Sequence, residues 1–135
     1  MRRTFPVLGA VAAVCLLAVP AGAQSDTQRK VIELAQKEAV KQLKAKLPQK
    51  IDEATTLVDV ASSGVILAYT FSIDTTTLKP MPNFIELVRK NTTATVCKTD
   101  GMVKAMKVGA VYRYIYVDAQ AKPLGQFDVK STDCA

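Results

Sequence analysis

The chain has 135 residues, no histidine, and a formal net charge of +6 from 18 basic and 12 acidic side chains. The absence of histidine removes the most frequent general base and the most frequent metal ligand, which disfavours most catalytic and metal-centred functions. The positive charge is too small and too dispersed for a nucleic-acid-binding surface, and it favours anionic components of a cell envelope as partners.

The first residues have the pattern of a secretory signal peptide. Arg2 and Arg3 precede an apolar run over 5–19, and Pro20 to Ala23 follow with small residues at the expected cleavage positions. The apolar run of roughly 15 residues is shorter than the ~20 that a membrane anchor needs. We therefore expect a signal peptide over 1–23, a single domain over 24–135, and a location in the periplasm or outside the cell. Loss of both arginines lowers the net charge from +6 to +4.

Two cysteines, Cys97 and Cys134, remain after cleavage near Ala23. An even pair in an oxidising compartment predicts a disulfide, which would stabilise the fold by on the order of 4 kcal/mol. The alternatives are a redox pair or a metal site. A redox pair usually has Cys-x-x-Cys spacing, and a metal site needs more ligands than two cysteines.

The first expected helix begins near Thr27 and ends before Pro48, because proline cannot continue a helix. Apolar residues recur every four positions and predict its buried stripe: Val31, Ala35, Ala39, Leu43 and Leu47, flanked by Ile32, Leu34 and Val40. Its lysine-rich face is either simply solvated or makes a weak contact with a membrane surface or a partner.

From Thr55 the apolar period changes to two, which predicts a hairpin over 55–73 with its turn at 62–64. A second helix is expected from Asn83 toward Cys97, and a third over 99–108 ending at Gly109. Two further strands follow at 110–117 and 124–130. The order α-β-β-α-α-β-β predicts an α+β fold in which an antiparallel four-stranded sheet, made of two hairpins, is packed on one face by two or three helices.

Three tyrosines at alternate positions, Tyr112, Tyr114 and Tyr116, share one face of the expected strand at 110–117. Such a row makes a broad, rigid and half-polar surface, so together with Arg113 it is the candidate binding surface. The alternative is that the three rings are packed beneath a helix.

One pattern extends over the last 40 residues: Cys97, the stretch Gly109–Asp118 with its Tyr-x-Tyr-x-Asp motif, Leu124–Val129, and the terminal Asp133-Cys134. In this pattern the chain resembles a group of small exported bacterial proteins of unknown function. The resemblance implies a disulfide and an envelope location, and it implies no activity, substrate or catalytic residue.

These observations favour a non-enzymatic periplasmic binding or accessory protein of the cell envelope, with no catalytic residue, metal or cofactor. Its expected partner is an envelope protein or an anionic envelope component, and not a nucleic acid. The alternative is a carrier of a lipid or another small apolar ligand. Such a carrier would hold its ligand in a cleft between helices and sheet lined by Leu67, Tyr69, Phe71 and Phe127.

Overall fold

The computed structural model describes residues 21–134, so the expected signal sequence up to Pro20 lies outside the described residues. Within 21–134 no helix is both long enough and apolar enough to cross a bilayer. The elements in chain order are α1 (Ala21–Lys44), β1 (Gln49–Lys50), β2 (Thr55–Ser63), β3 (Ile66–Ile73), α2 (Phe84–Val96), α3 (Asp100–Lys107), β4 (Val111–Asp118), β5 (Pro123–Val129) and the 3₁₀ helix η1 (Ser131–Cys134).

The described residues form a five-stranded mixed sheet with the strand order β1-β2-β3-β4-β5. The expected four-stranded antiparallel sheet is therefore wrong in two respects. The short β1 adds an edge strand, and β3 pairs with β4 in parallel while the other pairs are antiparallel. The parallel pair follows from the connection, because α2 and α3 return the chain to the end of the sheet where β3 began.

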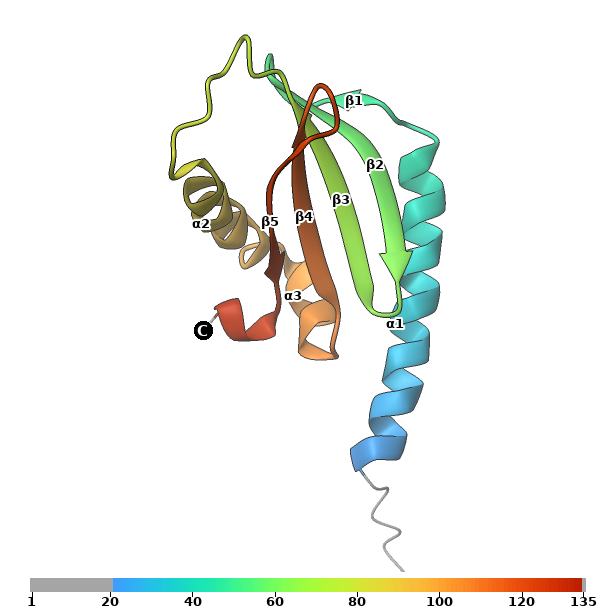
Figure 1. The fold of residues 1–135 in the computed structure, drawn as a ribbon. Helices are drawn as coiled ribbons and strands as arrows, with labels where there is room; N and C mark the ends of the chain where they lie inside the picture. Colours follow the sequence, from blue (N-terminus) through green and yellow to red (C-terminus); the bar gives the residue numbers. More distant parts are fainter. Residues whose placement is uncertain (1–20, 135) are drawn as a thin grey trace, which may run out of the picture.

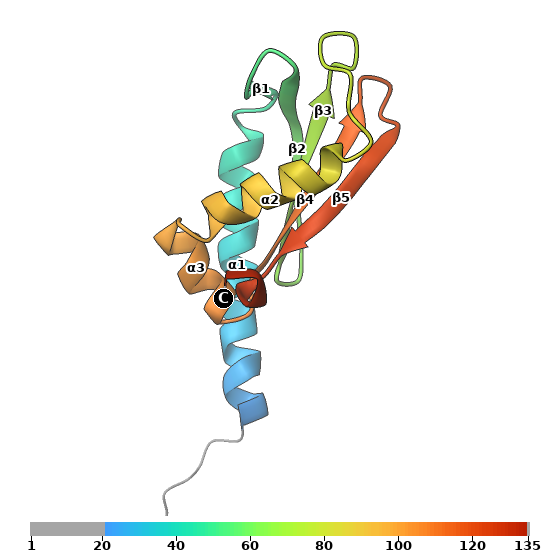
Figure 2. The ribbon, with the colours of Figure 1, turned by 90° about the vertical axis from the view of Figure 1, so that its left-hand side faces the viewer.

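All three α-helices lie on one face of the sheet, as expected from the sequence. In Figure 1 the strands lie in front of the helices, and the quarter turn to Figure 2 shows the helices together on one side. The first helix contacts β2 and β3, whereas α2 contacts β5. The opposite face of the sheet has no helix over it among the described residues.

The buried side of α1 differs by one position from the expected stripe. Ile32 and Gln36 are each 5% exposed, whereas Val31 is 62% exposed. The Gln36 side chain is satisfied because its Nε2 donates a hydrogen bond of 3.2 Å to the Val65 carbonyl, next to the β2–β3 turn. This polar contact and Ile32 together set the rotation of the helix on the sheet, so the expectation that Val31 faces the core is wrong.

The hydrophobic core lies between the sheet and the helices. The buried strand residues Leu57, Leu67 and Phe127 meet helix residues such as Val96 and Met106 there. A bulge in β2 after Leu57 breaks the period of two, so that Val58 is exposed while Val60 is completely buried. The bulge keeps both Leu57 and Val60 on the core face.

The helix α2 lies unusually close to β5 at one point. A Cβ atom added to Gly125 would come within 2.5 Å of Cγ1 of Ile85, and the φ angle of this glycine is +153°. Both the space and the backbone conformation therefore require glycine at this position. Gly125 lets the first turns of α2 approach the edge strand.

Candidate partner-binding groove

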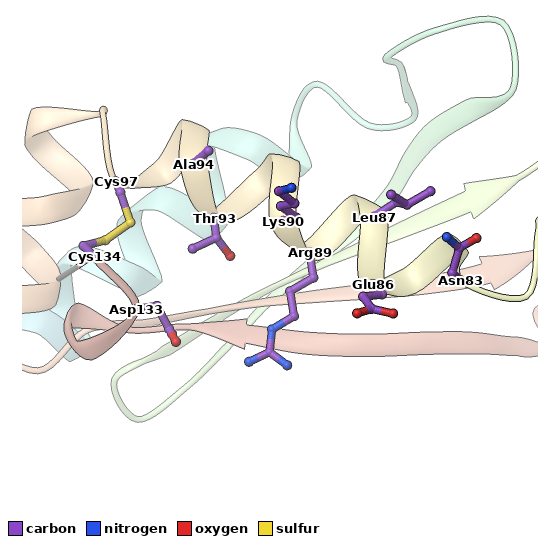
Figure 3. Close-up of a pocket in the computed structure, with 10 residues that line it drawn as sticks. All are labelled: Asn83, Glu86, Leu87, Arg89, Lys90, Thr93, Ala94, Cys97, Asp133 and Cys134. Carbon is purple, nitrogen blue, oxygen red and sulfur yellow. A yellow bond between two sulfur atoms is a disulfide. The ribbon is translucent and has the colours of Figure 1, made fainter.

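A groove of about 780 Å³ runs along α2 to the C-terminal 3₁₀ helix η1 (Figure 3). It combines apolar and charged groups, and its end is formed by the disulfide. The lining residues are Asn83, Glu86, Leu87, Arg89, Lys90, Thr93, Ala94, Cys97, Asp133 and Cys134.

The helical repeat places the lining residues between Asn83 and Cys97 along the outer flank of α2, since positions three or four apart lie on one face. Asp133 and Cys134 come from η1. In Figure 3 Leu87, Lys90 and Ala94 follow one side of the helix, while Arg89 and Asp133 point to the other. Leu87 is 40% exposed although it is apolar. An exposed leucine and an exposed alanine between charged side chains make an amphipathic strip that suits a peptide or protein partner.

The predicted disulfide between Cys97 and Cys134 is present in the structure, with a Cα–Cα distance of 5.3 Å. Cys97 is the C-terminal cap of α2, and Cys134 ends η1. The bridge therefore joins two elements that are 37 positions apart in the sequence, and it holds η1 as one wall of the groove.

Four charged side chains lie along the groove: Glu86, Arg89, Lys90 and Asp133. Among residues 21–134 the ion pair is between Arg113 and Asp128, outside the groove. The Asp133 carboxylate accepts a hydrogen bond of 2.9 Å from the backbone N–H of Lys130, and none of the four groove charges forms an ion pair within the described residues. Their opposite signs favour a partner that itself carries both signs over one that is uniformly anionic.

The three tyrosines of the candidate binding surface are in the core. Tyr112, Tyr114 and Tyr116 are only 7%, 8% and 7% exposed, and the Tyr114 ring stacks on Tyr69 and Phe127 with centroid separations of 5.3 and 5.4 Å. The arrangement agrees with the alternative given above, in which the three rings are packed beneath helices. The rings leave almost no area for a partner.

Arg113 lies on the opposite face of β4 and does not join the tyrosines. Its Nε and one terminal nitrogen donate hydrogen bonds of 2.8 and 3.1 Å to the two carboxylate oxygens of Asp128, its cross-strand partner in β5. These bonds raise the pKa of the guanidinium above its ordinary value. The structure thus divides the predicted surface between two faces of the sheet, because alternate strand residues point in opposite directions.

The phenol groups under the helices are held in their neutral form. Burial raises the pKa of Tyr69 to about 12, with a further contribution from Tyr112. Burial also raises the pKa values of Tyr112 and Tyr114, and that of Tyr116 despite a hydrogen bond with Thr92 that lowers it. The tyrosines therefore act as neutral packing groups near physiological pH.

The cleft expected for an apolar ligand is not formed by the expected residues. Leu67 and Phe127 are 3% and 6% exposed, so they are packed in the core, while Tyr69 and Phe71 are half-buried. A smaller hollow of about 320 Å³ does lie beside Tyr114 under the flank of α2. Over residues 21–134, no three His, Cys, Asp or Glu side chains gather in a way that could hold a metal ion.

Apart from Cys97 and Cys134, the groove residues were not identified as a site from the sequence, including Leu87, Ala94 and Asp133. These residues form no recognisable sequence motif. A mixture of apolar and charged residues is ordinary in a surface helix, so it does not mark a site. The one signal that could have indicated the groove is the cysteine pair. It predicts that the end of the second helix and the terminal segment meet, and a junction of two elements is a common place for a hollow.

Solved structures with the same fold include two pilotins. No protein-family profile matches the chain, and no curated protein matches its sequence significantly. The pilotin EpsS of the Vibrio vulnificus type 2 secretion system has a TM-score of 0.72 and 15% identity, covering 82% of this chain and 97% of that one. The type II secretion pilotin AspS of Vibrio cholerae has a TM-score of 0.68 and 16% identity, covering 85% and 100%.

A protein of Pseudomonas aeruginosa described as secreted has a TM-score of 0.71 and 16% identity, covering 80% of this chain and 96% of that one. At such low identity the likeness is one of fold. It extends over nearly the whole length of each of the three structures, so the shared fold is that of a complete small domain.

Proposed function

We propose that this protein is a non-enzymatic accessory protein of the bacterial cell envelope that serves a type 2 secretion system, in the manner of a pilotin. The observation that supports this most directly is the fold, which is similar to two pilotins over more than four fifths of the chain. The resemblance of the last 40 residues to small exported bacterial proteins remains a proposal, and it is consistent with the same envelope location.

The groove along α2 is the proposed partner site. It is the larger of the two hollows described above, and its lining mixes an exposed leucine with four charges. An envelope protein with an amphipathic segment would place its apolar side chains against Leu87 and Ala94. Its charged side chains would meet Arg89, Lys90 and Asp133.

The test is secretion by a strain from which the gene has been deleted. We expect reduced release of type 2 secretion substrates, restored by the wild-type gene and not by Ala94→Arg. Arginine favours helix and position 94 is exposed, so the variant should fold while a bulky charge obstructs the groove. The matched control is Ala119→Arg, which places the same side chain in the exposed β4–β5 turn and should restore secretion fully.

Two outcomes would contradict the proposal. Normal secretion in the deletion strain would remove the secretion role altogether. Full rescue by Ala94→Arg, together with unchanged cross-linking of a photoreactive residue at position 87 to envelope proteins, would remove the groove as the site while leaving the role intact.

The proposed location is the periplasmic side of the envelope, after removal of residues 1–23. In the structure α1 starts at Ala21, so the proposed cut before Gln24 falls in its first turn. The mass of the protein recovered from the envelope fraction tests this. We expect the mass of 24–135 with one disulfide, and an intact N-terminus would overturn the proposed processing.

A further inference from the structure

The outward face of α1 carries a row of lysines beside two exposed apolar side chains. Leu34 is 67% exposed and Val31 is 62% exposed. With 100° per residue, Lys30, Lys37 and Lys41 all lie within about 60° of Leu34 on the helix surface. All three lysines are exposed.

The charges on this face are mainly positive. One acid, Glu38, lies in the same sector, and its carboxylate accepts a hydrogen bond of 3.3 Å from Gln42. Asp26 and Glu33 lie one helical turn before Lys30 and Lys37, at the edge of the row, and Glu33 is half-buried toward the β2–β3 turn. The exposed Lys44 lies at the same angle around the helix as Asp26 and offsets its charge. The exposed sector around Leu34 therefore has more positive than negative groups, with an apolar pair beside them.

The shape of this face is convex and straight. Neither hollow described above includes a residue of α1. Figure 1 shows that the N-terminal part of the helix extends beyond the ends of the strands, so this end of the helix stands clear of the sheet. From Lys30 to Lys41 the row is about 16 Å long at 1.5 Å per residue.

We propose that this face of α1 is a contact surface for an anionic phospholipid membrane. A membrane surface is flat, fluid and negatively charged, so it fits a convex helix with dispersed lysines better than a shaped protein socket does. The lysine ammonium groups would stay among the headgroups while Leu34 and Val31 enter the interface. The contact is weak and reversible, and it lies on a different element from the groove.

The experiment measures binding of the protein, purified from the envelope fraction, to sedimented vesicles. One set of vesicles contains phosphatidylglycerol with phosphatidylethanolamine, and the other contains only phosphatidylcholine. We expect binding to the anionic vesicles alone, weakening as salt rises. The triple variant Lys30→Gln, Lys37→Gln, Lys41→Gln should lose about fivefold in partitioning for each lysine, or about a hundredfold in all.

The matched control removes the same charge elsewhere. Lys98, Lys104 and Lys107 are exposed around α3, and changing all three to glutamine lowers the net charge equally. This control should bind almost as well as the wild type. Leu34→Ser should weaken binding by roughly tenfold without changing its salt dependence, since it removes apolar area and no charge.

Equal binding to both kinds of vesicle would overturn the proposal. An equal loss in the two triple variants would overturn it as well, because net charge alone would then explain the binding. If the vesicles bind nothing while the α1 triple variant loses an acidic protein partner, the face docks protein and the membrane proposal fails. None of these results depends on the secretion assay.

Discussion

The two faces of β4 are almost equally apolar in sequence and have opposite roles in the structure. On one face Tyr112, Tyr114 and Tyr116 are at most 8% exposed under the helices. On the other face Arg113 and Ile115 are half-buried, with no helix over them among the described residues.

The difference teaches that hydrophobicity alone did not decide which face is covered. The aromatic face offers stacking across three strands, since the rings of Tyr69, Tyr114 and Phe127 lie within 5.4 Å of their neighbours. Aromatic rings have the largest area to bury, so the helices are positioned where burial releases most water. The open face of β4 carries aliphatic side chains and the charged Arg113, and it tolerates solvent at a smaller cost.

The largest expected loss of stability comes from a substitution on the covered face of β4, compared with one on the open face. Tyr114→Ala should lower the free energy of unfolding by about 3–5 kcal/mol, because it removes a buried ring at the centre of the aromatic stack. Its neighbour on the open face provides the comparison, and Ile115→Ala should cost only about 1 kcal/mol. Urea unfolding of the two variants measures both values, and equal losses would contradict the comparison.

The next effect concerns the contact between α2 and the sheet. Gly125→Ala should destabilise the protein by about 2–4 kcal/mol, because its Cβ would approach the Ile85 side chain to 2.5 Å at a φ angle of +153°. The adjacent Gln126→Ala on the open face should change stability by less than about 0.5 kcal/mol.

A double variant, Gly125→Ala with Ile85→Ala, identifies the cause. If the steric contact is responsible, the double variant is more stable than the sum of the single changes predicts. Additive losses would attribute the effect of Gly125→Ala to its backbone conformation alone.

Alkaline pH should lower the stability of the protein through the buried tyrosines of the covered face. The pKa of Tyr69 is raised to about 12 in the folded protein, above the ordinary value of 10. The neutral phenol is therefore favoured by folding, so its stabilisation is complete below pH 10 and is lost as the pH rises from about 10 to about 12.

Tyr69→Phe cannot ionise, and the fall of its melting temperature over this pH range should be shallower than that of the wild type. The phenolate absorbance of the wild-type protein reports all four tyrosines, so the difference between its titration and that of Tyr69→Phe follows the ionisation of Tyr69. Ionisation of Tyr69 near pH 10 while the protein is still folded would contradict the expectation.

The smallest effect belongs to the ion pair on the open face. Arg113 and Asp128 are about one third exposed, so Asp128→Asn should cost under ~1 kcal/mol and the cost should shrink at high salt. Unfolding in urea at low and high salt measures this. A loss of stability above about 2 kcal/mol, or a loss that salt does not reduce, would contradict the comparison. It would mean that the ion pair is shielded from solvent and that the face is not open.

Several elements could be predicted because their signals are local. The alternation from Val65 to Ile73 identifies β3, and Gly109 ends α3 with a positive φ of 110°. The placement of all helices on one face also follows from the pattern. The parallel pairing of β3 with β4 was not predicted, because strand direction depends on how the α2–α3 connection folds back, and no single residue encodes that.

Other features depend on contacts that cannot be read from one segment. The rotation of α1 is set by a glutamine, Gln36, whose buried position depends on the distant Val65 carbonyl. The groove forms only where η1 is held against α2. Its lining residues come from both elements, so neither segment alone indicates a site. The tyrosine row was identified correctly as a strand face, but only the helices decide that it is interior.

The bridge between Cys97 and Cys134 closes a covalent ring that contains α3, β4 and β5. A protease that cuts the exposed β4–β5 turn near Lys122 would therefore open the ring without releasing a fragment. The piece with β5 and η1 would stay attached to α2 through sulfur, beside the groove it helps to form. A nicked molecule would run as one species without reductant and as two species with it.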